Sequence, residues 1–121
     1  MEHRSRDIAK DEWKLFFDHT SRHYRGRTVD LFCRTKPGEV ARAVAKNLPF
    51  IGCTLESDGA NNASLVVIAG NASHDDEQLV SHTVRIPKRV WIRQEANGGD
   101  NAMGVESQDG SALIIEFATA H

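Results

Sequence analysis

The stretch NASHDDEQLVSHTV gathers residue types that bind metals, because His74, Asp75, Asp76 and His82 fall within nine positions. Structural zinc sites use Cys or His at short repeated spacings, such as C-x₂-C or H-x₃₋₅-H, which this stretch lacks. A calcium loop needs alternating oxygen ligands, a glycine and a distal glutamate, which are also missing. We therefore predict no metal site and no cofactor here, and whether these four side chains converge stays open.

Other patterns that carry chemistry are absent from the sequence. His19 and His23 are four positions apart on an expected helix, but they lack the glutamate of an H-E-x-x-H zinc motif. The chain has no phosphate-binding G-x-x-x-x-G-K-[ST] loop, no G-x-G-x-x-G turn and no G-x-S-x-G nucleophile elbow. We predict no catalytic residue, although catalytic groups need be close only in space.

The segment RIPKRVWIR suggests a binding surface. Its cations surround one aromatic ring, and the residues concerned are Arg85, Lys88, Arg89, Trp91 and Arg93. Alternation places Trp91 on the side of a strand opposite Val90 and Ile92. A basic strip with an exposed ring is typical of single-stranded nucleic acid binding, where cations contact phosphates and the ring stacks on bases. The alternative is that the ring packs against the protein and the cations pair with nearby carboxylates.

Two cysteines, Cys33 and Cys53, each alternate with aliphatic residues in segments that have the pattern of strands. Both are therefore expected to be small core residues. A disulfide between neighbouring strands is the alternative, but a chain without a secretion signal favours reduced thiols.

Composition predicts an ordinary globular protein. The chain has 121 residues, of which 40% are hydrophobic and 26% charged, which is the size and composition of a single domain spanning residues 1–121. No segment has the length of apolar sequence that spans a membrane, and the charged start MEHRSRDIAKDEW does not read as a signal peptide. We expect no membrane association and a cytoplasmic location. The formal charge is +4 over residues 1–46 and −6 over residues 47–121, so a basic face is conceivable if the first elements share one side.

The elements that must position these residues begin with a helix, expected over residues 9–24. Its apolar residues recur with a period of 3.6, and they are Ala9, Trp13, Phe16, Phe17, Thr20 and Tyr24. Gly26 supplies a carboxy-terminal cap. So much aromatic surface is rarely left in water, so we expect this helix to dock on the rest of the chain.

Residues 27–118 read as short strands. The period-two alternation predicts five to seven strands with hairpin connections. The strands are separated by a break near Pro49, a bend or boundary at Pro87 and an Asp-Gly turn at Asp109. We take the segment that holds His74 to be a polar loop, and place His82 at the start of the next strand. The predicted fold class is α+β, with the helix packed on a small, mostly antiparallel β-barrel or strongly twisted sheet, Sm-like or SH3-like by analogy.

The segments DEWKLFFDHTSRHYRG, NLPFIGCTLE, HTVRIPKRVWIRQ and GVESQDGSALIIEF resemble a family of small bacterial single-domain proteins classed as a domain of unknown function. The resemblance covers nearly the full chain. It implies a small bacterial protein and supplies no catalytic residue.

The leading functional hypothesis is a non-enzymatic binding or interaction module, with an unknown protein partner or self-association through exposed strand edges. The second is RNA or single-stranded DNA binding through the basic strip around Trp91. The third is a small-molecule site between helix and sheet.

Overall fold

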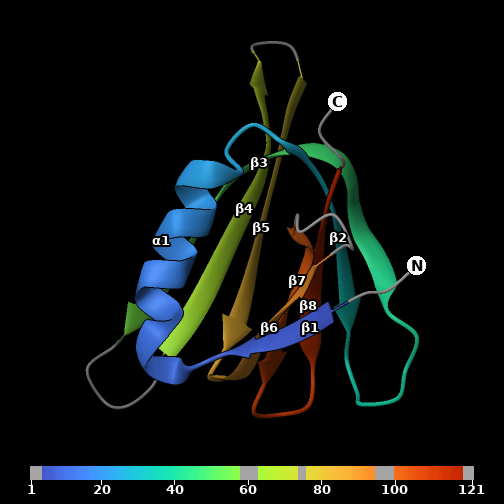
Figure 1. Cartoon of the computed structure of the whole chain (residues 1–121). Coiled ribbons are helices and arrows are strands. Elements are labelled where there is room, and N and C mark those ends of the chain that lie inside the picture. Colours follow the sequence, from blue (N-terminus) through green and yellow to red (C-terminus); the bar gives the residue numbers. More distant parts are fainter. Residues whose placement is uncertain (1–3, 58–62, 74–75, 95–99, 119–121) are drawn as a thin grey trace.

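Eight strands form one antiparallel sheet, and a single α-helix packs against it (Figure 1). The computed structural model describes residues 4–57, 63–73, 76–94 and 100–118. The elements, in chain order, are β1 (Arg4–Ile8), the 3-10 helix η1 (Lys10–Glu12), α1 (Trp13–His23), β2 (Thr28–Arg34), β3 (Arg42–Ser57), β4 (Ala63–Ser73), β5 (Asp76–Arg85), β6 (Pro87–Gln94), β7 (Asp100–Ser107) and β8 (Ala112–Phe117).

The strand order is β1-β6-β7-β8-β2-β3-β4-β5, so β1 and β5 are the two edges. All neighbouring strands pair antiparallel. The α+β class is confirmed, but the expected number of five to seven strands is too low, and a closed barrel is not formed by the described strands. One missed strand is β1, since the charged segment Arg4–Ile8 does not alternate clearly. The first element is therefore a strand and not the helix.

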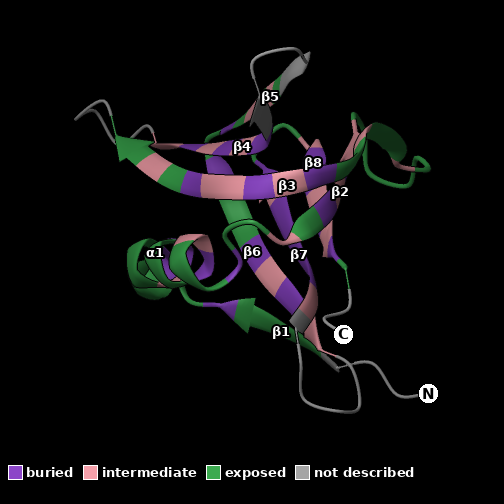
Figure 2. Ribbon diagram, turned by 90° about the horizontal axis from the view of Figure 1, so that it is seen from above, coloured by how far each residue is buried: buried purple, intermediate pink, exposed green. Residues whose placement is uncertain are grey.

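Strand β3 changes partner along its length. Its first part, to Pro49, pairs with β2, and its second part, from Phe50, pairs with β4. The strand is not interrupted, but the pairing register shifts on both sides of Pro49, so the irregularity expected there is present as a bulge or bend. Asn47 has φ 58°, and its backbone N–H donates to Asp30 Oδ1 at 2.9 Å. This distortion lets the sheet curl, so that β3 with β4 and β6 with β7 lie in two layers (Figure 2).

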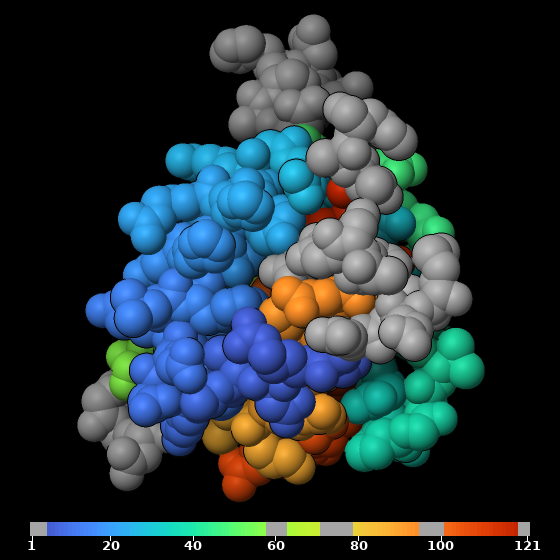
Figure 3. All heavy atoms as spheres, in the orientation of Figure 1, coloured from blue at the N-terminus to red at the C-terminus, as the bar shows by residue number. Residues whose placement is uncertain are grey.

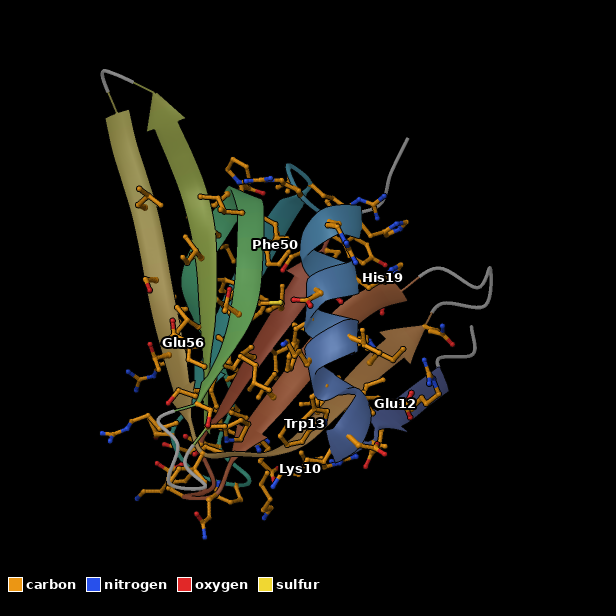
Figure 4. All side chains as sticks on the ribbon, turned by 90° about the vertical axis from the view of Figure 1, so that its left-hand side faces the viewer. Lys10, Glu12, Trp13, His19, Phe50 and Glu56 are labelled. Carbon is orange, nitrogen blue, oxygen red and sulfur yellow. The ribbon has the colours of Figure 1, made fainter. Side chains whose placement is uncertain are left out.

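Helix α1 docks on β3 and closes the open side of the curled sheet. Trp13, Phe17 and Tyr24 are buried as the helical periodicity predicts, and Phe16 is half-buried. Figure 4 shows Trp13 and Phe50 between α1 and the strands. The place considered for a small molecule between helix and sheet is therefore occupied by aromatic side chains.

Polar contacts fix the helix in register with β3. Ser21 Oγ donates to the Cys53 carbonyl at 2.9 Å and accepts from the Cys53 N–H at 2.9 Å. At the end of the helix, the Gly26 N–H donates to Phe50 O, and the Phe50 N–H donates to Arg27 O, both at 2.8 Å. At its start, Trp13 Nε1 donates to Ile8 O at 2.9 Å, so the helix is also tied to β1. The atoms of β1 and α1 form one continuous surface in Figure 3.

One cluster of buried side chains forms the core. It joins the helix to the inward faces of the strands, and its largest fully buried members are Phe17, Phe50, Leu31, Leu65, Met103, Leu113 and Ile115. No helix in the described ranges is long and apolar enough to span a bilayer.

Candidate functional site

The predicted basic strip lies on the outer face of β6, the face turned away from the core. Arg89, Trp91 and Arg93 alternate with the buried Val90 and Ile92. The expectation that Trp91 points away from the Val90 and Ile92 side is therefore confirmed.

Three cations of this strip pair with carboxylates on β1, β7 and β8. Arg89 Nε and Nη2 donate to the two carboxylate oxygens of Asp7 on β1, at 3.0 and 2.9 Å. This pairing lowers the pKa of Asp7 and raises that of Arg89. The other pairs are Lys88–Glu106, at 3.4 Å, and Arg93–Glu116, at 3.6 Å. Three of the four cations of the strip thus have a carboxylate partner, in line with the alternative interpretation, and Glu106 also pairs with Arg34 at 3.4 Å.

The Trp91 ring packs directly on Gly104 of β7. A Cβ atom added at Gly104 would meet the ring atoms Cε2 and Cζ2 at 2.1 Å. Trp91, Gly104, Ile114 and Phe32 are register partners on four neighbouring strands, and we call them the outer row. The three side chains of the outer row are half-buried, so this face presents an apolar band bordered by the ion pairs.

Arg85 stands apart from the rest of the predicted strip. It is an exposed residue at the end of β5, and Ile86 separates it from β6. Ile86 has φ 50°, which is strained for a β-branched residue. Its N–H donates to Ala63 O and its carbonyl accepts from the Gln108 N–H, which holds the bend. The bend lines a shallow cavity of about 340 Å³ with Arg85, Ser107, Gln108 and Asp109.

The residues of the NASHDDEQLVSHTV stretch do not form the cluster considered from the sequence. His74 and Asp75 lie outside the described residues, and Asp76 begins β5. The expected loop is shorter than predicted, because β4 runs to Ser73. His82 lies well inside β5 and not at its start. Within the described ranges, no group of three or more His, Cys, Asp or Glu side chains is arranged to hold a metal.

His82 instead faces Cys33. The Cys33 Sγ and His82 Nε2 atoms are 3.6 Å apart, and both residues are half-buried. Burial raises the pKa of the Cys33 thiol and lowers the pKa of the His82 imidazole. The alternation of β2 correctly turns Cys33 toward the interior. Sequence reasoning missed the pair because only the curl of the sheet brings the interior faces of β2 and β5 together.

Cys53 is a core residue, as expected. Its thiol is buried against α1, and burial raises its pKa to about 11. Both cysteines are free, so the alternative of a disulfide is not realised.

His19 and His23 lie on the exposed side of α1. Their rings stack with centroids 5.4 Å apart. They lie away from the buried stripe, as the helical spacing predicts.

The edge strand β5 is long and carries an uncharged exposed segment. All ten residues pair with β4. Leu79, Ser81 and Thr83 are exposed, and Leu79 retains 54% of its accessible surface. In contrast, the opposite edge strand β1 has five residues, three of them charged.

Comparison with known proteins gives one match. The model of a family of unknown function, DUF5335, matches residues 4–121. The chain belongs to the DUF5335 family. This confirms the resemblance to a domain of unknown function, and the match covers every described residue of this DUF5335 chain. No curated protein and no solved structure is significantly similar to it.

Proposed function

We propose that this DUF5335 chain is a non-enzymatic interaction module that self-associates through the edge of β5. The observation that carries the proposal is the position of β5: it pairs with β4 along its whole length and has no second neighbour in the order of the described strands. The outward backbone N–H and C=O groups of an edge strand can pair with another chain.

The two edges of the sheet differ in how they discourage such pairing. Short length, charged side chains and prolines are the usual protections of an edge. β1 is short and highly charged, and its Asp7 is held by Arg89 on the neighbouring strand. The segment Leu79–Val84 of β5 contains neither a charge nor a proline, and it exposes Leu79. β5 is therefore the edge that favours association.

Charge complementarity favours a second copy of this chain as the partner. β5 has acidic residues, Asp76 and Glu77, at its amino end and Arg85 at its carboxyl end. Antiparallel pairing of two copies about a two-fold axis places the amino end of each strand beside the carboxyl end of the other. Opposite charges then meet at both ends, and the uncharged segments meet in the middle.

A matched pair of lysine substitutions tests the proposal. Thr83 on β5 and Thr54 on β3 are both exposed and both in register with Val66, so they lie on one row of the same face. Thr83 is on the edge strand β5, whereas Thr54 lies next to Cys53, whose N–H and carbonyl are bonded to Ser21 of α1, so the helix covers that side of β3. Sedimentation equilibrium should show a concentration-dependent dimer for the unmodified chain and for Thr54→Lys, and a monomer for Thr83→Lys. Wild-type protein that stays monomeric, or equal dimerisation of both variants, would contradict the proposal.

The nucleic-acid hypothesis remains a prediction with less support from the geometry. Lys88, Arg89 and Arg93 already have carboxylate partners, so phosphates would have to compete with them. Trp91 is half-buried on Gly104. The outer row would still offer a surface on which bases could stack.

A further inference from the structure

A thiol and an imidazole from distant parts of the chain meet on the interior side of the sheet. Cys33 on β2 and His82 on β5 are separated by 49 positions in sequence. In the strand order, β3 and β4 lie between their two strands, so the contact crosses the curled sheet and does not follow a strand pair. Both side chains are half-buried. A ligand could therefore reach them from solvent while the strands hold them in place.

The separation of the two atoms fits a shared metal ion. Zinc binds thiolate sulfur at about 2.3 Å and imidazole nitrogen at about 2.0–2.1 Å, in tetrahedral geometry. Two such ligands on one ion are then about 3.6 Å apart, from the same distances and a tetrahedral angle. The observed Sγ to Nε2 distance is 3.6 Å, so the two atoms already have the separation of two ligands of one ion.

The two side chains also supply the donor atoms that zinc takes in proteins, a cysteine sulfur and an imidazole nitrogen. An arriving divalent ion forms the metal–sulfur bond and displaces the thiol proton to solvent, which makes binding dependent on pH. Arg42, the register partner of Cys33 on β3, is exposed, so its charge is screened by solvent.

We propose that Cys33 and His82 form an open binding site for a borderline divalent cation of the zinc class, with water in the remaining coordination positions. The described residues supply no third ligand at this place, so the ion stays exchangeable and accessible, unlike a closed structural zinc site. The site does not depend on self-association through β5.

Zinc titration in competition with a chromogenic chelator tests the proposal, with Co²⁺ as a second probe. We expect one ion per chain, release of one proton per ion near pH 7, and a thiolate-to-cobalt charge-transfer band. Cys33→Ser and His82→Gln should each weaken binding by more than about tenfold, since even outer-shell partners of a metal ligand contribute about 10–100-fold. Cys33→Ala serves as a second variant if Cys33→Ser does not fold.

Two control variants distinguish this site from other side chains of the same chain that could bind zinc. Cys53→Ser removes the thiol buried against α1, and binding should persist. The double variant His19→Gln, His23→Gln removes the exposed helical pair that could itself chelate an ion, and binding should again persist. The proposal would be overturned if either control lost zinc binding, or if Cys33→Ser kept it. It would also be overturned if the unmodified chain bound no zinc, and the contact between Cys33 and His82 would then be a weak S–H···N hydrogen bond. Sedimentation of the metal-free protein reports on β5 separately, so the two proposals fail independently.

Discussion

Replacement of Gly104 by alanine tests the placement of Trp91 on the outer face. The added Cβ would lie 2.1 Å from two ring atoms of Trp91, whereas carbon atoms in contact are normally about 3.5–4.0 Å apart. The ring must therefore move by at least about 1.4 Å to restore contact distance. Overpacking of this kind costs about 1–3 kcal/mol. Alanine in place of glycine in a strand recovers about 0.5–1 kcal/mol of backbone entropy.

The midpoints of the two ranges give Gly104→Ala a net loss of about 1.2 kcal/mol in the free energy of unfolding, and their extremes give at most about 2.5 kcal/mol. For a chain of this length that corresponds to a fall of about 2–8 °C in Tm. In a Trp91→Ala background the clash is absent, so the same substitution should stabilise the protein by about 0.5–1 kcal/mol. The sign of the effect is thus expected to reverse.

Urea unfolding followed by far-ultraviolet circular dichroism measures all four corners of this double-mutant cycle. Gly52→Ala on β3 is the matched control, because its added Cβ would lie at an ordinary 3.4 Å from Ser21 Oγ. It should change stability little or raise it. An identical effect of Gly104→Ala with and without Trp91 would refute the described packing of the ring.

Three further predictions concern the helix, the thiol–imidazole pair and the basic strip. Ser21→Ala should cost about 1–3 kcal/mol in urea unfolding, because the Cys53 N–H and carbonyl lose their partner at 2.9 Å. The folded pKa of His82 lies below its ordinary value of 6.5, so its contribution to stability is present above about pH 6.5 and is lost as pH falls through the folded value. Urea unfolding at pH 7.5 and pH 5 should therefore show a smaller difference for His82→Gln than for the unmodified chain. The chain should bind single-stranded RNA only weakly, and salt should change that binding little, because Arg89 is already paired with Asp7. Salt-sensitive binding that Trp91→Ala abolishes would favour the nucleic-acid hypothesis instead.

Local periodicity is sufficient to predict the elements that bury one face. The helix appears near its expected limits because Trp13, Phe17 and Tyr24 recur at helical spacing. The last hairpin is where the Asp-Gly signal places it, and Gly110 adopts φ 93° there. The sequence did not predict β1 or the amino-terminal part of β5, because short or polar strands at sheet edges lack a clear buried face.

The candidate site depends on which distant strands lie side by side, and local sequence patterns do not reveal that order. The orientation of Trp91 follows from alternation, but its ion-paired neighbours and its contact with Gly104 depend on the order of β1, β6 and β7. Likewise alternation correctly places Cys33 in the interior, whereas the predicted strand start at His82 is wrong. Their contact crosses the curled sheet, because β3 and β4 lie between the two strands in the strand order.

Hydrogen–deuterium exchange at low and high protein concentration tests self-association through β5 most directly. The free edge of β5 should exchange quickly in the monomer, because its outward amides have no partner in the sheet order of the described strands. We expect a higher concentration to slow exchange within the segment Leu79–Arg85 and to leave exchange in β1 unchanged. Exchange in β5 that does not depend on concentration, or protection that appears instead on β1 or on the outer row, would contradict the proposal.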